Sequence, residues 1–167
     1  KQIMMKFVPC TGEYGRHEAQ TYTRSYIHRH RTRAFELGVF RWRGLQEYLH
    51  LVLDHVADPN KAVVDFGGAG CPLGFHSVVV DRLKQDAARR PVLYSSLGEL
   101  SEPADVVFAC HVLEHIPDLD AVLKDVSKAL RPGGVLIVLV PSFTNEGWHA
   151  GRHRNPRFGG HAWTFGL

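Results

Sequence analysis

The sequence contains few cysteines, no long apolar run and no strong excess of one charge. Its cysteines, Cys10, Cys71 and Cys110, are widely spaced and form no C-x-x-C pair, so neither a zinc knuckle nor a redox dithiol is indicated. The longest fully apolar run, Val135 to Val140, is far too short to cross a bilayer. No charged and then apolar leader opens the chain, so no secretion signal is expected. These absences favour a cytoplasmic protein without disulfides, metal staples or a membrane span.

The composition is that of an ordinary globular domain. The chain has 167 residues, of which 44% are hydrophobic, and this length favours a single domain with a real core. The formal net charge of +3 does not by itself imply nucleic acid. Within the one domain we distinguish a partly helical N-terminal arm, residues 1–40, from a ligand-binding core, residues 41–167. The sequence does not fix an oligomeric state.

Apolar periodicity predicts the first core elements. Residues 42–56 repeat apolar side chains at three- and four-residue steps, which indicates an amphipathic helix. The short β-branched segment 62–66 is typical of a buried strand, and it runs directly into a glycine-rich turn. After this turn we expect, in order, a helix and two strands: residues 73–89, 91–95 and 105–110.

The second half of the chain continues the alternation. Asp118 is a good N-cap for a helix that ends at Arg131–Gly134, and Val135–Val140 is typical of a fully buried strand. The tail, residues 141–167, is expected to be mostly loop. Strands alternating with helices indicate an α/β, Rossmann-like fold with a mostly parallel sheet and helices on both faces. In such sheets, ligands bind at the carboxyl ends of the strands.

The glycine turn begins at Asp65, where that rule places a ligand. Glycines there let the backbone approach a bound molecule, and Asp65 can accept hydrogen bonds from turn amides or, through water, from an ammonium group. A purely structural strand-to-helix turn is the alternative. A nicotinamide site is disfavoured, because Gly68, Gly70 and Gly74 give a spacing one residue too long for the dinucleotide motif.

Two later segments extend the pattern. Residues 104–116 read ADVVFACHVLEHI, and residues 130–138 read LRPGGVLIV. Together with Val63–Gly68, they strongly resemble the class I S-adenosylmethionine (SAM)-dependent methyltransferase superfamily, most of all the group that acts on small molecules and glycan-type acceptors. The resemblance covers residues 62–142. It implies that SAM is the cofactor and that the chain is an enzyme transferring a methyl group.

The resemblance also implies where SAM would bind. The first motif, which cradles the methionine end and the ribose, falls on the turn, and a strand end borders the sulfonium. Two residues lie roughly where the family has contacts to adenine. The implied cofactor-binding residues are Asp65, Gly67, Gly68, Ala69, Gly70, Ser96, Leu97, Ala109, Cys110 and His111.

Some features depart from the family pattern. Ala69 and Cys71 stand where the first motif usually has glycines, and the acidic residue that holds the ribose hydroxyls is not evident. The interval between the first motif and Asp105 is short, and the last two strands of the family do not follow. We therefore expect a truncated or reduced version of the fold. A non-catalytic, methyltransferase-like module is an alternative function.

His111 and His115 are the candidate catalytic bases. They follow the strand that ends at Cys110, and a base beside an acceptor hydroxyl accelerates methyl transfer by about 10²- to 10⁴-fold. The alternative is structural, since in this family the Glu114–His115 pair often braces the loop. A metal held by the two histidines is not favoured, because no spacing marks a third ligand. Tail histidines His149, His153 and His161 are further candidates.

Basic residues cluster at 28–33, at Arg41 and Arg43, and at 152–157. They could hold an anionic small-molecule acceptor or RNA, or they could form solvated surfaces. No nucleic-acid motif accompanies them, so an RNA-directed methyltransferase remains an alternative and is not the favoured function. We expect a methyltransferase that acts on a small-molecule or glycan-like acceptor.

Overall fold

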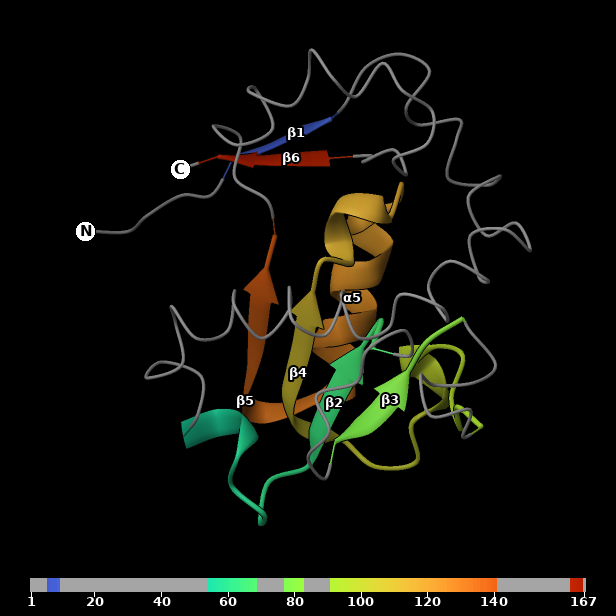
Figure 1. Ribbon diagram of the computed structural model, residues 1–167, viewed down its shortest axis with the longest axis vertical. Coiled ribbons are helices and arrows are strands. Elements are labelled where there is room, and N and C mark those ends of the chain that lie inside the picture. Colours follow the sequence, from blue (N-terminus) through green and yellow to red (C-terminus); the bar gives the residue numbers. More distant parts are fainter. Residues whose placement is uncertain (1–5, 10–53, 69–76, 83–90, 141–162, 167) are drawn as a thin grey trace, which may run out of the picture.

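A computed structural model of the chain describes residues 6–9, 54–68, 77–82, 91–140 and 163–166 (Figure 1). They form a four-stranded parallel sheet in the order β3-β2-β4-β5, with a separate antiparallel pair formed by β1 and β6. The predicted α/β fold with a mostly parallel sheet is confirmed. The strands are β1 (Lys6–Pro9), β2 (Val63–Phe66), β3 (Val78–Val80), β4 (Ala104–Cys110), β5 (Leu130–Leu139) and β6 (Trp163–Gly166).

Strand β4 is the centre of the sheet and is buried on both faces. Val106 and Phe108 point to one face, where they pack with Val56 and Val63. Val107 points to the other face, into a larger cluster. Burial on both sides explains why β4 consists almost entirely of apolar residues, as a central parallel strand requires.

Helix α5 (Leu119–Ala129) covers the second face of the sheet. It begins where predicted, because the Asp118 side chain accepts a hydrogen bond from the Ala121 backbone N–H at 3.0 Å. Its inward residues Leu119, Val126 and Ala129 are buried. Among the described residues, no helix is long and apolar enough to span a bilayer.

Helix α5 does not end in the glycine cap that the sequence predicted at Arg131–Gly134. Leu130 is already extended at φ −81° and ψ 138°, and β5 starts at this same residue. The register then jumps from Ala104–Leu130 to Val106–Val135, so Arg131–Gly134 forms a bulge within the β4–β5 ladder. Gly133 adopts a φ of +80° inside this bulge, and that conformation favours glycine.

The predicted helix over residues 73–89 is wrong in its middle. Residues 78–80 form β3, which pairs in parallel with β2, and Val80 is fully buried in the same core cluster as Val64 and Val107. Three consecutive valines favour an extended strand, and packing against β2 outweighs the helical spacing seen in the sequence. The predicted strand 91–95 is not continuous: Pro91 and Tyr94 are isolated bridge residues, and Tyr94 pairs with Val80.

One further expectation, on the burial of β5, needs correction. The apolar run Val135–Val140 was expected to be fully buried, but it is only half-buried, because β5 lies at the edge of the described sheet. In the N-terminal arm, expected to be partly helical, the four described residues form β1, which pairs with β6 from the other end of the chain. The remaining arm residues and the proposed division at residue 40 lie outside the described part.

The amino ends of the strands are tied together by Asp105. Its Oδ2 accepts a hydrogen bond from the Ala62 backbone N–H at 2.8 Å, and its Oδ1 lies 3.1 Å from the Arg131 guanidinium. Arg131 also donates to the Pro103 carbonyl at 2.9 Å. Both carboxylate oxygens of Asp105 therefore serve to hold β2, β4 and the bulge in register.

Candidate functional site

The predicted site segments meet at the carboxyl edge of the sheet. Parallel pairing places Asp65 opposite Phe108 and Phe66 opposite Ala109, so the glycine turn after β2 lies beside the end of β4. The predicted groups Asp65–Gly68 and Ala109–His111 are thus brought together. Ala69 and Gly70 lie outside the described residues, as do the tail histidines and all the basic clusters.

The structure explains why positions 67 and 68 are occupied by glycine. Gly67 adopts a φ of +75°, and a side chain added there would overlap that of Val112, in the loop after β4. A side chain at Gly68 would overlap the Asp65 carboxylate. The two glycines therefore let the β2 turn, the Asp65 carboxylate and the β4 loop approach one another closely.

Asp65 is the charged group at the end of β2, and its exposed fraction is 0%. A carboxylate at this depth fits a cationic or hydrogen-bonding group nearby, such as the turn amides or the ammonium of an amino acid. The Ala109 and Cys110 side chains are also buried. Any contact of these two residues with a ligand would therefore come from their backbone atoms.

The predicted adenine contacts lie at the short 3₁₀ helix η1 (Leu97–Glu99). Leu97 is buried in the core with Val64 and Val107, so its side chain packs rather than faces solvent. Ser96 is exposed, and its hydroxyl donates to Glu99 Oε1 at 3.2 Å. Hydrogen bonds from the Ser95 hydroxyl and backbone N–H hold the pKa of Glu99 below its ordinary value, with a smaller contribution from Ser96.

His111 directly follows β4 in an unusual conformation. Its φ is +54°, in the left-handed region that non-glycine residues rarely adopt. Its backbone N–H donates to the Leu139 carbonyl at 2.8 Å, which continues the β4–β5 ladder by one step. Strained backbone of this kind is common at functional sites, where the surrounding structure holds it in place. The ladder and the turn together fix the direction of the imidazole.

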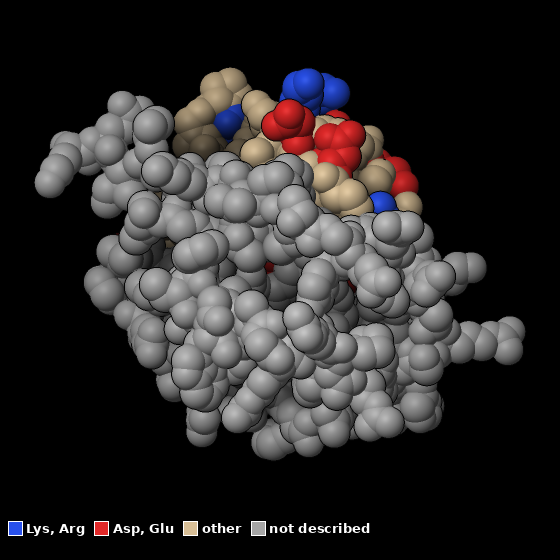
Figure 2. All heavy atoms as spheres, turned by 90° about the horizontal axis from the view of Figure 1, so that it is seen from above, with Lys and Arg blue, Asp and Glu red and all other residues tan. Residues whose placement is uncertain are grey.

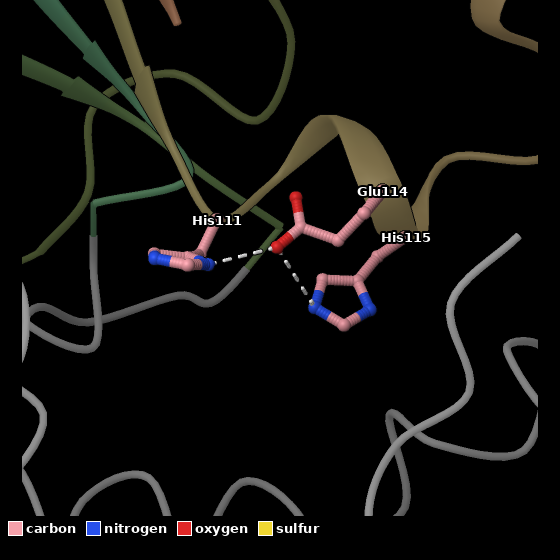
Figure 3. A network of polar contacts seen from close by, with 3 residues as sticks. All are labelled: His111, Glu114 and His115. Carbon is pink, nitrogen blue, oxygen red and sulfur yellow. Dashed lines mark hydrogen bonds and ion pairs between the residues drawn. The ribbon is translucent and has the colours of Figure 1, made fainter. Parts of the chain in front are cut away.

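Glu114 lies between the two predicted base residues (Figure 3). It belongs to the 3₁₀ helix η2 (Leu113–His115), and its Oε1 is 3.1 Å from His111 Nδ1 and 3.9 Å from His115 Nε2. The Glu114 side chain is 1% exposed, whereas those of His111 and His115 are 30% and 27% exposed. Its second oxygen, Oε2, is buried and has no hydrogen-bond partner. Such an orphaned acceptor costs about 1–3 kcal/mol.

Sequence reasoning treated Glu114 only as a brace for the loop and not as a site residue. Its i, i+3 spacing from His111 was a usable signal, because one helical turn places such residues on the same side. The depth of its burial was not visible, since the surrounding sequence alternates polar and apolar residues. Within the described residues, no cluster of three or more His, Cys, Asp or Glu is arranged to hold a metal ion.

Comparison with known proteins supports the kinship inferred from the motifs. A family model described as a methyltransferase domain matches residues 71–136. Residues 71–136 are therefore similar to a methyltransferase domain, which supports the expected family, enzyme class and cofactor.

A curated relative and a solved structure are similar to the methyltransferase domain. The relative is a ubiquinone biosynthesis O-methyltransferase of Paramagnetospirillum magneticum, 34% identical over 91 residues that make up 52% of this chain. The match spans only 36% of that relative's length. The solved structure is described as a DhpI–SAM–HEP complex, with 15% identity, a TM-score of 0.43, and coverage of 89% of this chain and 75% of the other.

The antiparallel pair of β1 and β6 lies near the carboxyl edge of the parallel sheet. Strand β6 runs beside η2, so the β1–β6 pair lies over this end of the sheet (Figure 1). Strand β6, near the end of the chain, therefore lies beside the short helix that contains His115.

The described surface of the methyltransferase domain mixes acidic and basic side chains (Figure 2). On the exposed side of α5, Lys128 lies 3.5 Å from Asp125, and Asp120 and Lys124 are also exposed. Alternating signs of this kind create no strong field of one sign. The exposed side of α5 therefore offers no basic patch for a polyanion.

Proposed function

We propose that the methyltransferase domain transfers a methyl group from SAM to a hydroxyl oxygen of a small molecule. The observation that carries the proposal is the pair formed by His111 and the buried Glu114 at the carboxyl end of β4. A hydroxyl acceptor benefits from a base, and an imidazole that is partly exposed beside a buried carboxylate suits that task. The ubiquinone O-methyltransferase among its relatives supports an oxygen acceptor on a small molecule.

The chemical types of the residues at the carboxyl edge of the sheet are suitable for binding SAM. Gly67 and Gly68 have no side chains of their own, so the turn backbone comes close to Val112 and to the Asp65 carboxylate, and Asp65 supplies a buried carboxylate for the amino-acid end. The proposed cofactor contacts are Asp65, Gly67, Gly68 and the backbone of Ala109–His111, together with Ala69, Gly70, Ser96 and Leu97 as predictions from the family. SAM supplies an electrophilic methyl group on a sulfonium.

In the proposed reaction, His111 accepts the proton of the acceptor hydroxyl while an oxygen lone pair forms the new C–O bond. The C–S bond breaks and its electron pair stays on sulfur, which leaves S-adenosylhomocysteine, a methyl ether and an imidazolium. The imidazolium then returns its proton to water. The main task of the site is to hold the two reactants in line, which can lower the barrier by about 7–11 kcal/mol.

The alternatives are less well supported. A match to a methyltransferase family favours an enzyme over a non-catalytic module. The RNA-directed alternative depends on basic clusters outside the described residues, and the exposed side of α5 adds no basic patch. A glycan-like or anionic acceptor and a cytoplasmic location stay predictions.

Two measurements test the proposal. Calorimetric titration of the chain with SAM should give saturable heat that S-adenosylhomocysteine abolishes by competition. Transfer from methyl-labelled SAM should then be measured on a panel of small phenols, alkyl alcohols and primary amines, with labelled ethers expected from a hydroxyl compound. Absence of both binding heat and a thermal shift at millimolar SAM would reject the proposal. Labelling of the amines alone would reject the oxygen acceptor.

A further inference from the structure

The role of Glu114 goes beyond bracing the loop. Two imidazoles, those of His111 and His115, converge on one oxygen of the Glu114 carboxylate, and the other oxygen of this carboxylate is buried and unpaired (Figure 3). A purely structural carboxylate would be expected to use both oxygens, because an unpaired buried acceptor destabilises the fold. This arrangement therefore needs an explanation in terms of the site.

We propose that Glu114 is a positioning residue that fixes the tautomer and direction of His111, so that His111 Nε2 accepts the proton of the acceptor. The inference rests on the proposed function and deepens it. When the Glu114 carboxylate is ionised it can only accept hydrogen bonds, and the contact at 3.1 Å then places the proton on His111 Nδ1. In neutral imidazole the lone pair then resides on Nε2, at the far side of the ring from Glu114.

The distances select His111 over His115 as the base. Glu114 Oε1 is within hydrogen-bond reach of His111 Nδ1, but its 3.9 Å separation from His115 Nε2 is too long for a hydrogen bond. Only the His111 ring is therefore fixed by the carboxylate. The backbone adds a second constraint, because the φ of +54° and the hydrogen bond to the Leu139 carbonyl hold His111 at the strand end.

The unpaired oxygen gives the carboxylate its electrostatic effect. A carboxylate that accepts several hydrogen bonds has its charge largely compensated, whereas Glu114 accepts one described hydrogen bond and lies 1% exposed. Its charge is therefore directed mainly at the two imidazoles. A buried carboxylate hydrogen-bonded to Nδ1–H stabilises the imidazolium that forms when Nε2 takes a proton.

The direct test is the tautomer of His111, which nitrogen NMR of the imidazole reads without cofactor or acceptor. In the unaltered protein, we expect neutral His111 to carry its proton on Nδ1. Glu114→Gln should reduce this preference, because an amide can turn either its oxygen or its NH₂ toward Nδ1. Glu114→Leu, which removes both oxygens, should abolish it. Glu102→Gln, an exposed site before β4, is the matched control and should leave the tautomer unchanged.

Kinetics on a hydroxyl compound that accepts the label provide the second test. We expect Glu114→Gln to lower kcat by about tenfold to a hundredfold, part of the factor of about 10²–10⁴ for a full base, while SAM affinity is retained. A structural role would instead change the melting temperature and SAM affinity together. The spectrum of the unaltered protein keeps the proposal testable even if both variants at Glu114 fail to fold.

Three results would overturn the inference. One is a proton on Nε2 of neutral His111 in the unaltered protein, and another is an Nδ1 proton that persists in both Glu114 variants. The third is activity lost on chelation and restored by a divalent metal, since the imidazole lone pairs would then bind the ion. Absence of SAM binding, in contrast, would reject the proposed function, and the tautomer measurement separates that failure from a failure of the inference.

Discussion

The two ends of β4 each carry a carboxylate, and the two are used in opposite ways. At the amino end, Asp105 is partly exposed and engages both oxygens, one with the Ala62 backbone and one with Arg131. At the carboxyl end, Glu114 is almost completely buried, yet one of its oxygens has no partner. The better-buried carboxylate is thus the less satisfied one, which is the reverse of what stability alone would favour.

The backbone conformation also differs between the two ends of β4. The bulge after α5 places its positive φ on Gly133, where the conformation carries no steric penalty, whereas the turn after β4 places one on His111. Strain and an unpaired buried acceptor occur together within four residues of one strand end. Functional sites often combine backbone strain with unsatisfied polar groups, so this contrast supports the proposal that the carboxyl end is the place of chemistry.

Among the variants considered, removal of the His111 imidazole should have the largest effect on activity. For His111→Asn we expect kcat to fall by about 10²- to 10⁴-fold, because the base is lost. Asn is chosen because it tolerates the left-handed backbone better than most residues do. Label transfer to the hydroxyl compound measures the effect, and calorimetry should show that SAM still binds.

His55→Gln is the control for this variant. His55 precedes Val56, which packs with Val63 and Val106 on one face of the sheet, away from the β4 carboxyl end. Its activity should match that of the unaltered protein. His115→Gln should reduce kcat less than His111→Asn does, and the opposite ranking would assign the base to His115.

Addition of one methyl group at the glycine turn should disrupt the packing between β2 and the β4 loop. Gly68→Ala forces its side chain against the buried Asp65 carboxylate, and such overpacking destabilises by about 1–3 kcal/mol. Urea unfolding followed by circular dichroism measures the change. Gly98→Ala is the control, because the nearest atom to its added carbon is Ser96 Oγ at 3.9 Å. Equal stability of the two variants would contradict this account of the turn.

The sequence predicted the parts of the fold whose signals are local and mutually consistent. Asp118 caps α5 as expected, and the apolar β-branched run before Gly67 forms β2. The helix expected over 73–89 was wrong at β3, because Val78–Val80 gains more by pairing with β2 than its helical spacing indicates. The pairing of β1 with β6 joins the two ends of the chain, and no local pattern encodes such a contact.

The sequence predicted that the candidate residues share one edge of the sheet, but it did not predict the contact between His111 and Glu114. Motif spacing located Asp65, the turn glycines and His111 at one edge, because parallel strands bring their carboxyl ends together. The burial of Glu114 was missed, since it depends on how η2 folds back between two strand ends. The unpaired oxygen and the positive φ of His111 are properties of three-dimensional packing, and sequence periodicity carries no information on them.

Mutation at the amino end of β4, where Asp105 uses both carboxylate oxygens, should change the stability of the fold and not the rate of methyl transfer. For Asp105→Ala we expect a loss of about 1–2 kcal/mol, from one hydrogen bond to the Ala62 backbone and a half-exposed ion pair with Arg131. Chemical denaturation measures the loss, and SAM affinity should be unchanged. Glu102→Ala, at a neighbouring exposed position, should leave stability unaltered. A selective loss of SAM binding in Asp105→Ala would show that the two ends are coupled.

The smallest effect is expected at Glu99, whose carboxylate accepts hydrogen bonds from Ser95 and Ser96. These bonds hold its pKa below the ordinary value of 4.5. A lowered folded-state pKa stabilises the fold above the unfolded pKa, and the contribution is lost as pH falls through the folded value. The melting temperature of Glu99→Gln should therefore lie slightly below that of the unaltered protein at neutral pH. The difference should shrink once the pH drops below 4.5, and its persistence in stronger acid would show that the side chain acts through shape and not through charge.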